Sequence, residues 1–341
     1  MTSPAFLHCL LAAEASAAKS RALLRELGSL SESEAIAALR QHSALTDAER
    51  RRVVAGVPPI PGGVQLLAGD ELPELLLQAE GTPSALFVDG DPSALEAPTV
   101  AIVGTRAASA YGKACALKFG EALARAGVTV VSGGALGIDA AAHRGALEAG
   151  GRTAAVLAAG IDNVYPAVHA GLFRQIREQG CLVSQFAVGT KPGDYRFLIR
   201  NMTVAALSLA VLVVEAPLKS GAMRTAHAAA EYGRDVFVVP ANIDMMSFAG
   251  SFSLLRDGAT LVSHPDEILE AIGVEPVTAE ELAPASSTGE KILRVLSTSP
   301  IPTEVIVDRS GLDTADVLSE LTMLELEGRV IRDSGGYAIR P

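Results

Sequence analysis

The sequence predicts an α/β protein built on a doubly wound parallel sheet, with a small helical domain before it and a winged-helix domain after it. Three observations lead to this prediction. Between residues 64 and 272, short uncharged apolar segments alternate with helical segments, as expected of strands that are buried on both faces. Stretches rich in proline, glycine or small residues bracket this region, at 57–63 and 273–285. Residues 286–341 then read as three helices and a hairpin.

The elements follow one another in a regular order. Residues 1–58 predict helices, because Leu23, Leu24 and Leu27 recur at helical spacing. In the central domain, 64–272, strands are expected at 99–103, 128–131, 153–157, 209–214 and 236–239, and helices at 113–126, 139–148, 170–178 and 223–232. After a linker at 273–285, the last domain predicts helices at 290–296, 303–308 and 314–327, and a hairpin turn at 333–336.

Length and composition exclude several classes of protein. With 341 residues, 49% apolar and 20% charged, the chain is too apolar for intrinsic disorder and long enough for two or three domains. Its three cysteines, Cys9, Cys115 and Cys181, form no CxxC pair, which argues against a disulfide scaffold and favours the reducing cytoplasm. The apolar stretch 203–214 ends at Glu215, short of the ~18 residues of a membrane span. Neither a signal peptide nor a membrane partner is expected.

The charge is unevenly distributed along the chain. A formal net charge of −11 by itself disfavours a nucleic-acid partner. Residues 1–97 carry 7 basic and 13 acidic side chains, whereas residues 98–272 carry 15 basic and 14 acidic ones. The central domain therefore lacks the acidic excess of its flanks, and a polyanion is expected to bind there.

The winged-helix domain presents a conflict between its architecture and its charge. Three helices and a hairpin are a common arrangement for binding DNA. The third helix, however, carries Asp316, Glu320, Glu325 and Glu327 and no basic residue. A helix in the major groove must approach phosphates. Contact with a protein is therefore the favoured role, and duplex binding is the alternative. If this domain instead carries the single-strand affinity, Arg329, Arg332 and Arg340 of the hairpin are the expected contacts.

A glycine-rich loop follows the first central strand. In a parallel sheet, ligands bind beyond the carboxyl ends of the strands. Gly104 lets backbone N–H groups approach a phosphate there, beside Thr105, and Arg106 can bind the phosphate bidentately. Ser109 precedes a helix whose positive end we expect at the same place. The alternative is a tight turn with a surface arginine.

The loop after the second strand contains Gly133 and Gly134 and precedes Asp139 and His143, one helical turn apart. That spacing suits a pair of metal ligands. The favoured interpretation is that Asp139 caps the helix and His143 packs nearby.

A third loop, after the strand 209–214, contains Lys219, Ser220 and Gly221 and leads to Thr225. It is either another phosphate-binding loop or a plain strand-to-helix turn. Several such loops along one sheet edge suit an extended polyphosphate better than one mononucleotide.

The segment 194–201 interleaves aromatic and basic residues in a chain with only 4% aromatic residues. Tyr195 and Phe197 could stack on bases, and Arg196 and Arg200 could bind phosphates. The alternative is a helix start with Phe197 in the core.

Nucleotide-hydrolysis motifs are incomplete. Gly112-Lys113 is followed by Ala114, and Ala107 stands where a Walker A loop needs its first glycine. No GxGxxG follows a strand. We therefore expect no cofactor, no metal and no ATP hydrolysis.

Six segments together resemble one family. VAIVGTR, SGGALGIDAAAH, AAGIDNVYP, RFLIRNMTVAAL, VVEAPLKSGAMRTAHAAAEYGRDVFVVP and GATLV occur in this order between about residues 69 and 268. In these motifs the chain resembles the DprA/Smf family, the DNA-processing protein A of bacterial natural transformation. The resemblance implies an extended Rossmann-like sheet, a sterile-alpha-like domain at 1–58 and a winged helix at 286–341.

The resemblance also implies a function. Members of this family are cytosolic proteins that bind single-stranded DNA without catalysis, protect incoming transforming DNA and help to load the RecA recombinase, usually as homodimers through the Rossmann-like domain. Arg106 matches the arginine of the family's phosphate-binding loop, Phe197 its base-contacting aromatic residue, and Arg200 and Asn201 its R-N pair. The complete set of expected nucleic-acid-binding residues is Gly104, Thr105, Arg106, Ser109, Gly133, Gly134, Arg196, Phe197, Arg200, Asn201, Lys219, Ser220, Gly221 and Thr225.

Four positions depart from the family pattern. Leu136 stands where the family often has Arg, Gln185 where it usually has Glu, Met202 where it has a second Arg, and Ala241 where it has Gly. Losing two cations could weaken or reshape the DNA-binding track.

Two other functions compete with this one. The sheet also resembles nucleotide 5′-monophosphate phosphoribohydrolases, which use P-G-G-x-G-T-x-x-E. Here the position three after Thr225 is Ala228, so the acid needed to cleave the N-glycosidic bond is missing. A protein-interaction scaffold is the third candidate, and it would not bind DNA.

Overall fold

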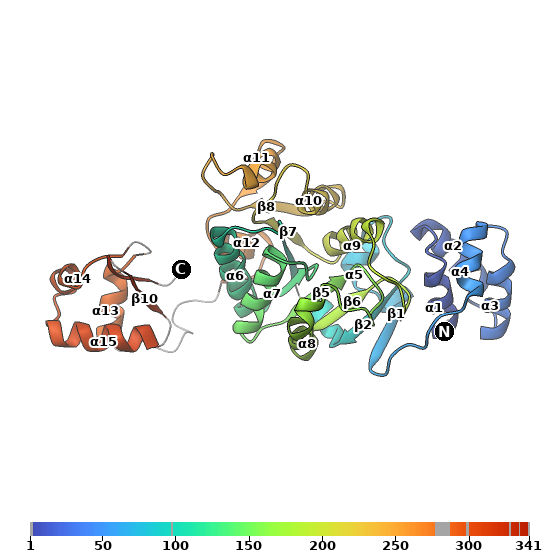
Figure 1. The fold of residues 1–341 in the computed structure, drawn as a ribbon, viewed down its shortest axis with the longest axis horizontal. Coiled ribbons are helices and arrows are strands. Elements are labelled where there is room, and N and C mark those ends of the chain that lie inside the picture. Colours follow the sequence, from blue (N-terminus) through green and yellow to red (C-terminus); the bar gives the residue numbers. More distant parts are fainter. Residues whose placement is uncertain are drawn as a thin grey trace. The chain divides into compact units, whose positions relative to one another are not determined.

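The computed structural model describes residues 3–96, 98–276, 287–297, 300–326, 329–333 and 335–339 (Figure 1). The chain divides into two compact units, Met1–Pro276 and Val277–Pro341. From residue 277 on, the predicted linker lies outside the described residues, as do Glu327 and Arg340 of the winged helix. Among the described helices, none combines the length and the apolar character needed to cross a membrane.

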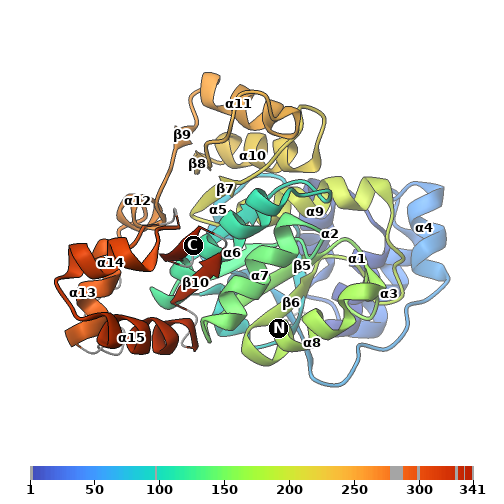
Figure 2. The same ribbon diagram turned by 60° about the vertical axis from the view of Figure 1, so that its left-hand side comes forward.

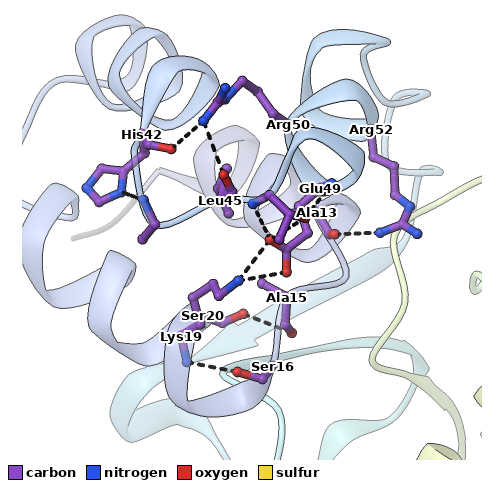
Figure 3. Close-up of polar contacts among 12 residues, drawn as sticks. Ala13, Ala15, Ser16, Lys19, Ser20, His42, Leu45, Glu49, Arg50 and Arg52 are labelled. Carbon is purple, nitrogen blue, oxygen red and sulfur yellow. Dashed lines mark hydrogen bonds and ion pairs between the residues drawn. The ribbon is translucent and has the colours of Figure 1, made fainter.

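The first unit begins with four short helices. They are α1 (Pro4–Ala12), α2 (Ala17–Leu27), α3 (Glu32–Gln41) and α4 (Asp47–Val54). Their buried core includes Phe6, Leu10, Leu23, Leu39 and Val53. Polar contacts fasten the helices to one another, as Figure 3 shows. Lys19 on α2 pairs with Glu49 on α4 at 2.9 Å, and Arg50 donates to the carbonyl oxygens of His42 and Leu45.

A nine-stranded sheet forms the centre of the first unit, in the order β1-β2-β6-β5-β4-β3-β7-β8-β9. Its strands are β1 (Val64–Ala68), β2 (Ala85–Gly90), β3 (Thr99–Val103), β4 (Thr129–Ser132), β5 (Thr153–Leu157), β6 (Cys181–Ser184), β7 (Ala210–Val213), β8 (Asp235–Val238) and β9 (Thr260–Leu261). Strand β2 runs antiparallel to both of its neighbours, β1 and β6, and every other adjacent pair in this sheet is parallel. In the middle, Ala101 of β3 pairs with Val131 of β4 and Val211 of β7.

Helices cover both faces of this sheet (Figures 1 and 2). On β3, Val100 and Ile102 pack toward α6 (Ala110–Arg125) and α7 (Ile138–Glu148). Ala101 and Val103 pack toward α9 (Asp194–Ala206) and α10 (Gly221–Glu231) on the other face. Strands buried on both faces in this way read as continuous apolar runs. The α-helices are α5 (Glu74–Gln78), α6 (Ala110–Arg125), α7 (Ile138–Glu148), α8 (Ala170–Gln179), α9 (Asp194–Ala206), α10 (Gly221–Glu231), α11 (Ala249–Arg256) and α12 (Pro265–Ala271). Single 3₁₀ turns lie at Gly69–Glu71, Pro92–Leu95, Ala167–His169 and Met246–Phe248.

The predicted doubly wound, mostly parallel sheet is confirmed, but the sequence prediction missed four strands. These are β1, β2, β6 and β9. The two-residue β9 is too short to give a clear apolar run, and β1 is interrupted by the exposed Gln65 and half-buried at its other positions. β2 begins with the apolar run Ala85–Val88, which the prediction did not use.

The second unit contains α13 (Ser287–Val295), α14 (Thr303–Ser310), α15 (Thr314–Leu326) and the antiparallel pair β10 (Val330–Asp333) and β11 (Gly336–Ile339). Ile292, Ile306, Val317 and Leu321 meet in its core. The predicted three helices and hairpin are confirmed. On α15, Asp316 and Glu325 are exposed.

Candidate nucleic-acid interface

A cavity of about 310 Å³ opens at the carboxyl ends of β3, β4 and β7. Strand β3 lies between β4 and β7, so the strands that follow β3 in the chain are added on both sides of it. This is where the strand order reverses. Ligands of doubly wound sheets bind at such a switch point. Helix α9 forms another wall of the cavity through Phe197 and Asn201.

The loop after β3 is closed by a buried carboxylate. Glu215, two residues after the end of β7, is 1% exposed, and its Oε2 accepts hydrogen bonds from Ser109 N (2.9 Å) and Ser109 Oγ (2.7 Å). Ser109 in turn caps α6 by accepting from Gly112 N. A Cβ at position 112 would lie 2.2 Å from Glu215 Oε2, so glycine is required there. The positive end of α6, which we expected to receive a ligand phosphate, instead holds an anion of the protein itself.

The loop after β4 is closed in a similar way. Asp139 Oδ2 accepts from Gly133 N (3.1 Å) and Ala135 N (3.3 Å). The prediction that Asp139 caps α7 is wrong, because Gly137 occupies the N-cap and Asp139 lies inside the first turn. From there its carboxylate reaches back to the loop amides. Burial raises the pKa of Asp139, while the charge of Arg200 and these hydrogen bonds oppose the rise.

Arg200 holds the loop after β4 against β5 from within. It is 5% exposed, and its Nη1 donates to the carbonyl oxygens of Gly133 and Val156, the latter at 2.7 Å. Its Nε donates to Asn201 Oδ1 at 3.1 Å. Burial lowers the pKa of Arg200 to about 10, so the guanidinium remains charged at neutral pH. Position 133 has to be glycine, because a Cβ there would lie 2.3 Å from Arg200 Nη1.

His143, the other half of the proposed metal pair, is fully buried and contacts Thr153 Oγ1 through Nδ1 at 2.6 Å. Burial, with the charges of His169 and Arg200, lowers the pKa of His143 to about 3. Its imidazole is therefore neutral and belongs to the packing between α7 and β5. In the described part of the chain, no group of three potential metal ligands gathers.

The loop after β7 is open. Ser220 caps α10 through its side chain, which accepts from Met223 N at 3.4 Å. Across the described residues, neither Gly221 N nor Ala222 N has a hydrogen-bond partner. Asn201 Nδ2 donates to Gly221 O at 3.2 Å and joins the start of α10 to α9. The N-terminus of α10 thus presents free N–H groups beside the cavity, and an anion is stabilised at such a place.

A stack of cationic and aromatic side chains stands at the cavity mouth. The Arg106 Cζ lies 4.8 Å from the centre of the Phe197 ring, and the Arg200 Cζ lies 5.9 Å from it. Arg106 is exposed and makes no hydrogen bond or ion pair within the described structure. Lys219 is likewise exposed. Phe197 is half-buried rather than part of the core. The mouth therefore combines ring faces with unpaired positive charge, the two features that single-stranded nucleic acids require.

The structure brings most of the predicted site residues together. Those lining the cavity are Gly104, Thr105, Arg106, Gly133, Phe197, Arg200, Asn201, Lys219, Ser220, Gly221 and Thr225. Three lie elsewhere. Ser109 is bound to Glu215, and Gly134 packs against Phe173 with its carbonyl oxygen facing His169. Arg196 points to the opposite side of α9 and pairs with Glu14 at 2.6 Å.

Sequence reasoning missed two residues of the site. Tyr165 is 46% exposed, and its ring centre lies 5.7 Å from that of Phe197, which extends the aromatic surface. It is eight residues beyond the end of β5, too far for the simple rule about strand ends. The signal for Glu215 was available, since a charge directly follows an uninterrupted apolar strand. A buried carboxylate at that place needs partners, and Ser109 provides them.

Comparisons with known proteins agree with this geometry. The model of a family described as DNA recombination-mediator protein A matches residues 64–273, and a DprA winged helix domain matches residues 281–336. Protein Smf of Escherichia coli K12 is 38% identical over 276 residues, which cover 78% of this chain and 74% of that protein.

Two solved structures are also similar. The X-ray structure of DNA processing protein A from Streptococcus pneumoniae is 28% identical with a TM-score of 0.68, over 79% of this chain and 98% of that one. A structure from Helicobacter pylori is 30% identical with a TM-score of 0.56, over 61% and 95% of the two chains. The latter is described as giving insights into the unique single-stranded DNA binding mode of DNA processing protein A.

Proposed function

This chain belongs to the DNA recombination-mediator protein A (DprA/Smf) family, and from that premise we propose that it binds single-stranded DNA at the cavity between β3, β4 and β7. The proposal includes protection of incoming transforming DNA in the cytoplasm and delivery of that DNA to the RecA recombinase. A homodimer formed through the Rossmann-like domain is part of the same proposal.

The observation that carries DNA binding is the stack of Arg106, Phe197 and Arg200. A base placed on the exposed side of this stack would gain the ~1–3 kcal/mol typical of stacking on an aromatic side chain. Arg106 and Lys219, with the open N-terminus of α10, would then contact the flanking phosphates. Tyr165 offers a second ring for the neighbouring base.

The shape of the cavity favours a single strand over a duplex. With about 310 Å³ and walls on three loops and α9, it admits a splayed base and its phosphate rather than a stacked base pair. On α15 of the winged helix, the exposed Asp316 and Glu325 disfavour an approach to duplex phosphates. We assign a protein-contact role to that domain.

We propose binding without catalysis. Thr225 Oγ1 donates to Gly221 O at 3.3 Å and is 2% exposed, so it is not presented as a nucleophile. Ala228 supplies no carboxylate where the phosphoribohydrolase pattern has glutamate. Mass spectrometry of the protein incubated with AMP should detect no free adenine. Adenine release that depends on Thr225 or Arg224 would favour the enzyme instead.

A mobility-shift titration of single- and double-stranded DNA of equal length, across a range of salt concentrations, tests the proposal. Single strands should bind much more tightly, and their affinity should fall as salt rises, because bound phosphates release counterions. Equal affinity for a blunt duplex would contradict the proposal. No binding of either would favour the interaction scaffold.

Deletion of residues 286–341 tests the role of the winged helix. The truncated protein should keep its affinity for single strands within a few-fold and lose a protein contact, such as the one with RecA in a pull-down. If a folded truncation loses most of its DNA affinity, Arg329 and Arg332 become the candidate DNA contacts.

A further inference from the structure

A second cavity lies on the opposite side of α9, where the N-terminal helices meet the sheet. Its volume is about 380 Å³, within the ~300–1,000 Å³ typical of small-ligand sites. Its lining includes Ser16, Ser84, Gln185, Tyr195, Arg196 and Met202. None of these lines the cavity at β3, β4 and β7. The two cavities share α9 as their dividing wall.

Several polar groups of this second cavity lack partners in the described structure. Ser84 is 6% exposed, and its Oγ makes no hydrogen bond. Gln185 accepts from Thr203 Oγ1 through Oε1, which leaves its amide NH₂ group free. Helix α2 also begins at this cavity. Ser16 caps it by accepting from Lys19 N (Figure 3), while the N–H groups of Ala17 and Ala18 are unbonded. A buried hydroxyl without a protein partner is available to hydrogen-bond to a ligand or to water.

The charges of the second cavity are already satisfied. Arg196 Nε and Nη2 donate to Glu14 Oε1 at 2.8 and 2.6 Å, and Arg196 Nη1 donates to Lys191 O at 3.1 Å. Arg196 and Glu14 are the only charged residues in the described lining of this cavity. A phosphate would therefore find no unpaired cation there. The remaining lining is largely apolar, with Phe186, Ile199 and Met202. The chemistry suits a flat, neutral ligand that accepts and donates a few hydrogen bonds.

We propose that the second cavity receives a nucleobase of the same DNA strand that occupies the first. Tyr195, which is 69% exposed at the beginning of α9, lies one residue before Arg196 and two before Phe197. A strand leaving Phe197 can therefore pass over the start of α9, stack a base on Tyr195 and insert it beside Ser84 and Gln185. This inference rests on the proposed single-strand binding and adds a second base-binding step to it.

The test fills the second cavity without touching the first. Ala18 is an exposed lining residue, so Ala18→Trp should block the cavity and leave the fold intact. Ala37→Trp, an exposed position on α3 outside the described cavities, is the matched control. Fluorescence anisotropy should show that Ala18→Trp loses at least about fivefold in affinity for strands of about 16 nucleotides, the lower end of the ~1–3 kcal/mol of one lost stacked base. Strands of about four nucleotides, the shortest site size of single-strand binders, should be unaffected.

A fluorescence experiment identifies directly which base of the strand enters the second cavity. 2-Aminopurine placed at successive positions of the long strand should be quenched at one position that depends on Tyr195 and at another that depends on Phe197. Ala18→Trp should remove only the first. Tyr195→Ala, at a residue that is 69% exposed, should reproduce the loss and guards against a folding artefact of the tryptophan.

The outcomes separate this inference from the proposed function. If the parent binds no single strand, the proposed function fails. If the parent binds but Ala18→Trp and Ala37→Trp bind strands of every length alike, with unchanged quenching, the second base site does not exist. If free deoxyadenosine raises the melting temperature of the parent but not of Ala18→Trp, while long-strand affinity is the same in both, the ligand is a free nucleoside and the assignment to the strand is wrong.

Discussion

The loops after β3 and β7 lie on adjacent strands and both lead into a helix, yet they treat the helix N-terminus differently. At α6 the carboxylate of Glu215 accepts from Ser109, and the N-terminus is already occupied. At α10 the corresponding N-cap residue, Ser220, has no carboxylate partner, and its backbone N–H makes no hydrogen bond in the described residues. The loop after β4 belongs with the first, because Asp139 takes its amides. A glycine-rich loop after a strand is thus not an anion site by itself, since an internal carboxylate can occupy it.

Because of this difference, the closed loops after β3 and β4 and the open loop after β7 offer a ligand different kinds of contact. The two closed loops present side chains, above all Arg106, from a backbone that internal hydrogen bonds hold in place. The open loop presents the backbone itself. Variants of each part should therefore fail in different ways.

Glu215→Ala is the variant that should change the molecule most. It removes the acceptor of two hydrogen bonds to a buried charge and should lower the free energy of unfolding by ~2–3 kcal/mol, measured by urea denaturation. The matched control is Glu215→Gln, whose carbonyl oxygen can still accept from Ser109.

The same variant should turn the closed N-terminus of α6 into an open one. Sulfate or phosphate should then restore the stability of Glu215→Ala more than it stabilises the parent protein, because the vacated helix end attracts an anion. Equal stabilisation of both proteins would mean that the two helix ends do not differ as described.

Arg106→Ala tests the side chain that the closed loop presents. Loss of a charge-assisted contact to phosphate, worth ~1.5–3 kcal/mol, corresponds to roughly a ten- to hundredfold weaker affinity for single-stranded DNA. The salt dependence should become shallower by about one phosphate contact. Arg125→Ala, at the far end of α6, is the control and should leave both quantities unchanged. If a folded Arg106→Ala variant binds single-stranded DNA with parental affinity, the 104–106 loop is only a turn and not a phosphate contact.

Phe197→Ala separates stacking from charge at the same site. It should lose ~1–3 kcal/mol of binding free energy and keep the parental salt dependence, since no cation is removed. A salt dependence reduced as much as in Arg106→Ala would show that Phe197 acts by positioning Arg106, whose guanidinium it contacts at 4.8 Å.

Lys219→Ala probes the open loop and should have the smallest effect. Here the backbone N–H groups of α10 remain, so we expect a loss of about three- to fivefold, below ~1 kcal/mol, with a shallower salt dependence. Arg224→Ala, exposed on the body of α10, is the control. A loss larger than that of Arg106→Ala would reverse the assignment of the main phosphate contact.

The sequence predicts the central sheet well because its strands are buried on both faces. Thr99–Val103 and Thr153–Leu157 are fully buried and were predicted with their correct bounds. The edge strand β1 has exposed or half-buried side chains throughout, so its apolar pattern is weak. The clustering of the loops followed from the parallel sheet, because parallel strands place the loops that follow them along one edge.

The direction of individual side chains could not be derived in this way. Arg196 and Arg200 are one helical turn apart on α9, yet Arg196 pairs with Glu14 and Arg200 is buried under the loop after β4. Their surroundings come from residues more than 60 positions away in the chain, such as Gly133 and Glu14. Sequence spacing carries no information about such partners.

The bond between His8 and Val188 has a consequence for how the first unit unfolds. His8 on α1 is 3% exposed, its Nε2 accepts from Val188 N at 3.1 Å, and its ring packs edge-on against Phe87 of β2. With the pair Glu14–Arg196, this fastens the N-terminal helices to the sheet at two separate points. Separating the two would expose Leu7 and Leu11, which pack with Phe87 and Leu157. A heated sample should therefore lose the helices and the sheet in one cooperative transition, with calorimetric and van't Hoff enthalpies that agree for this unit.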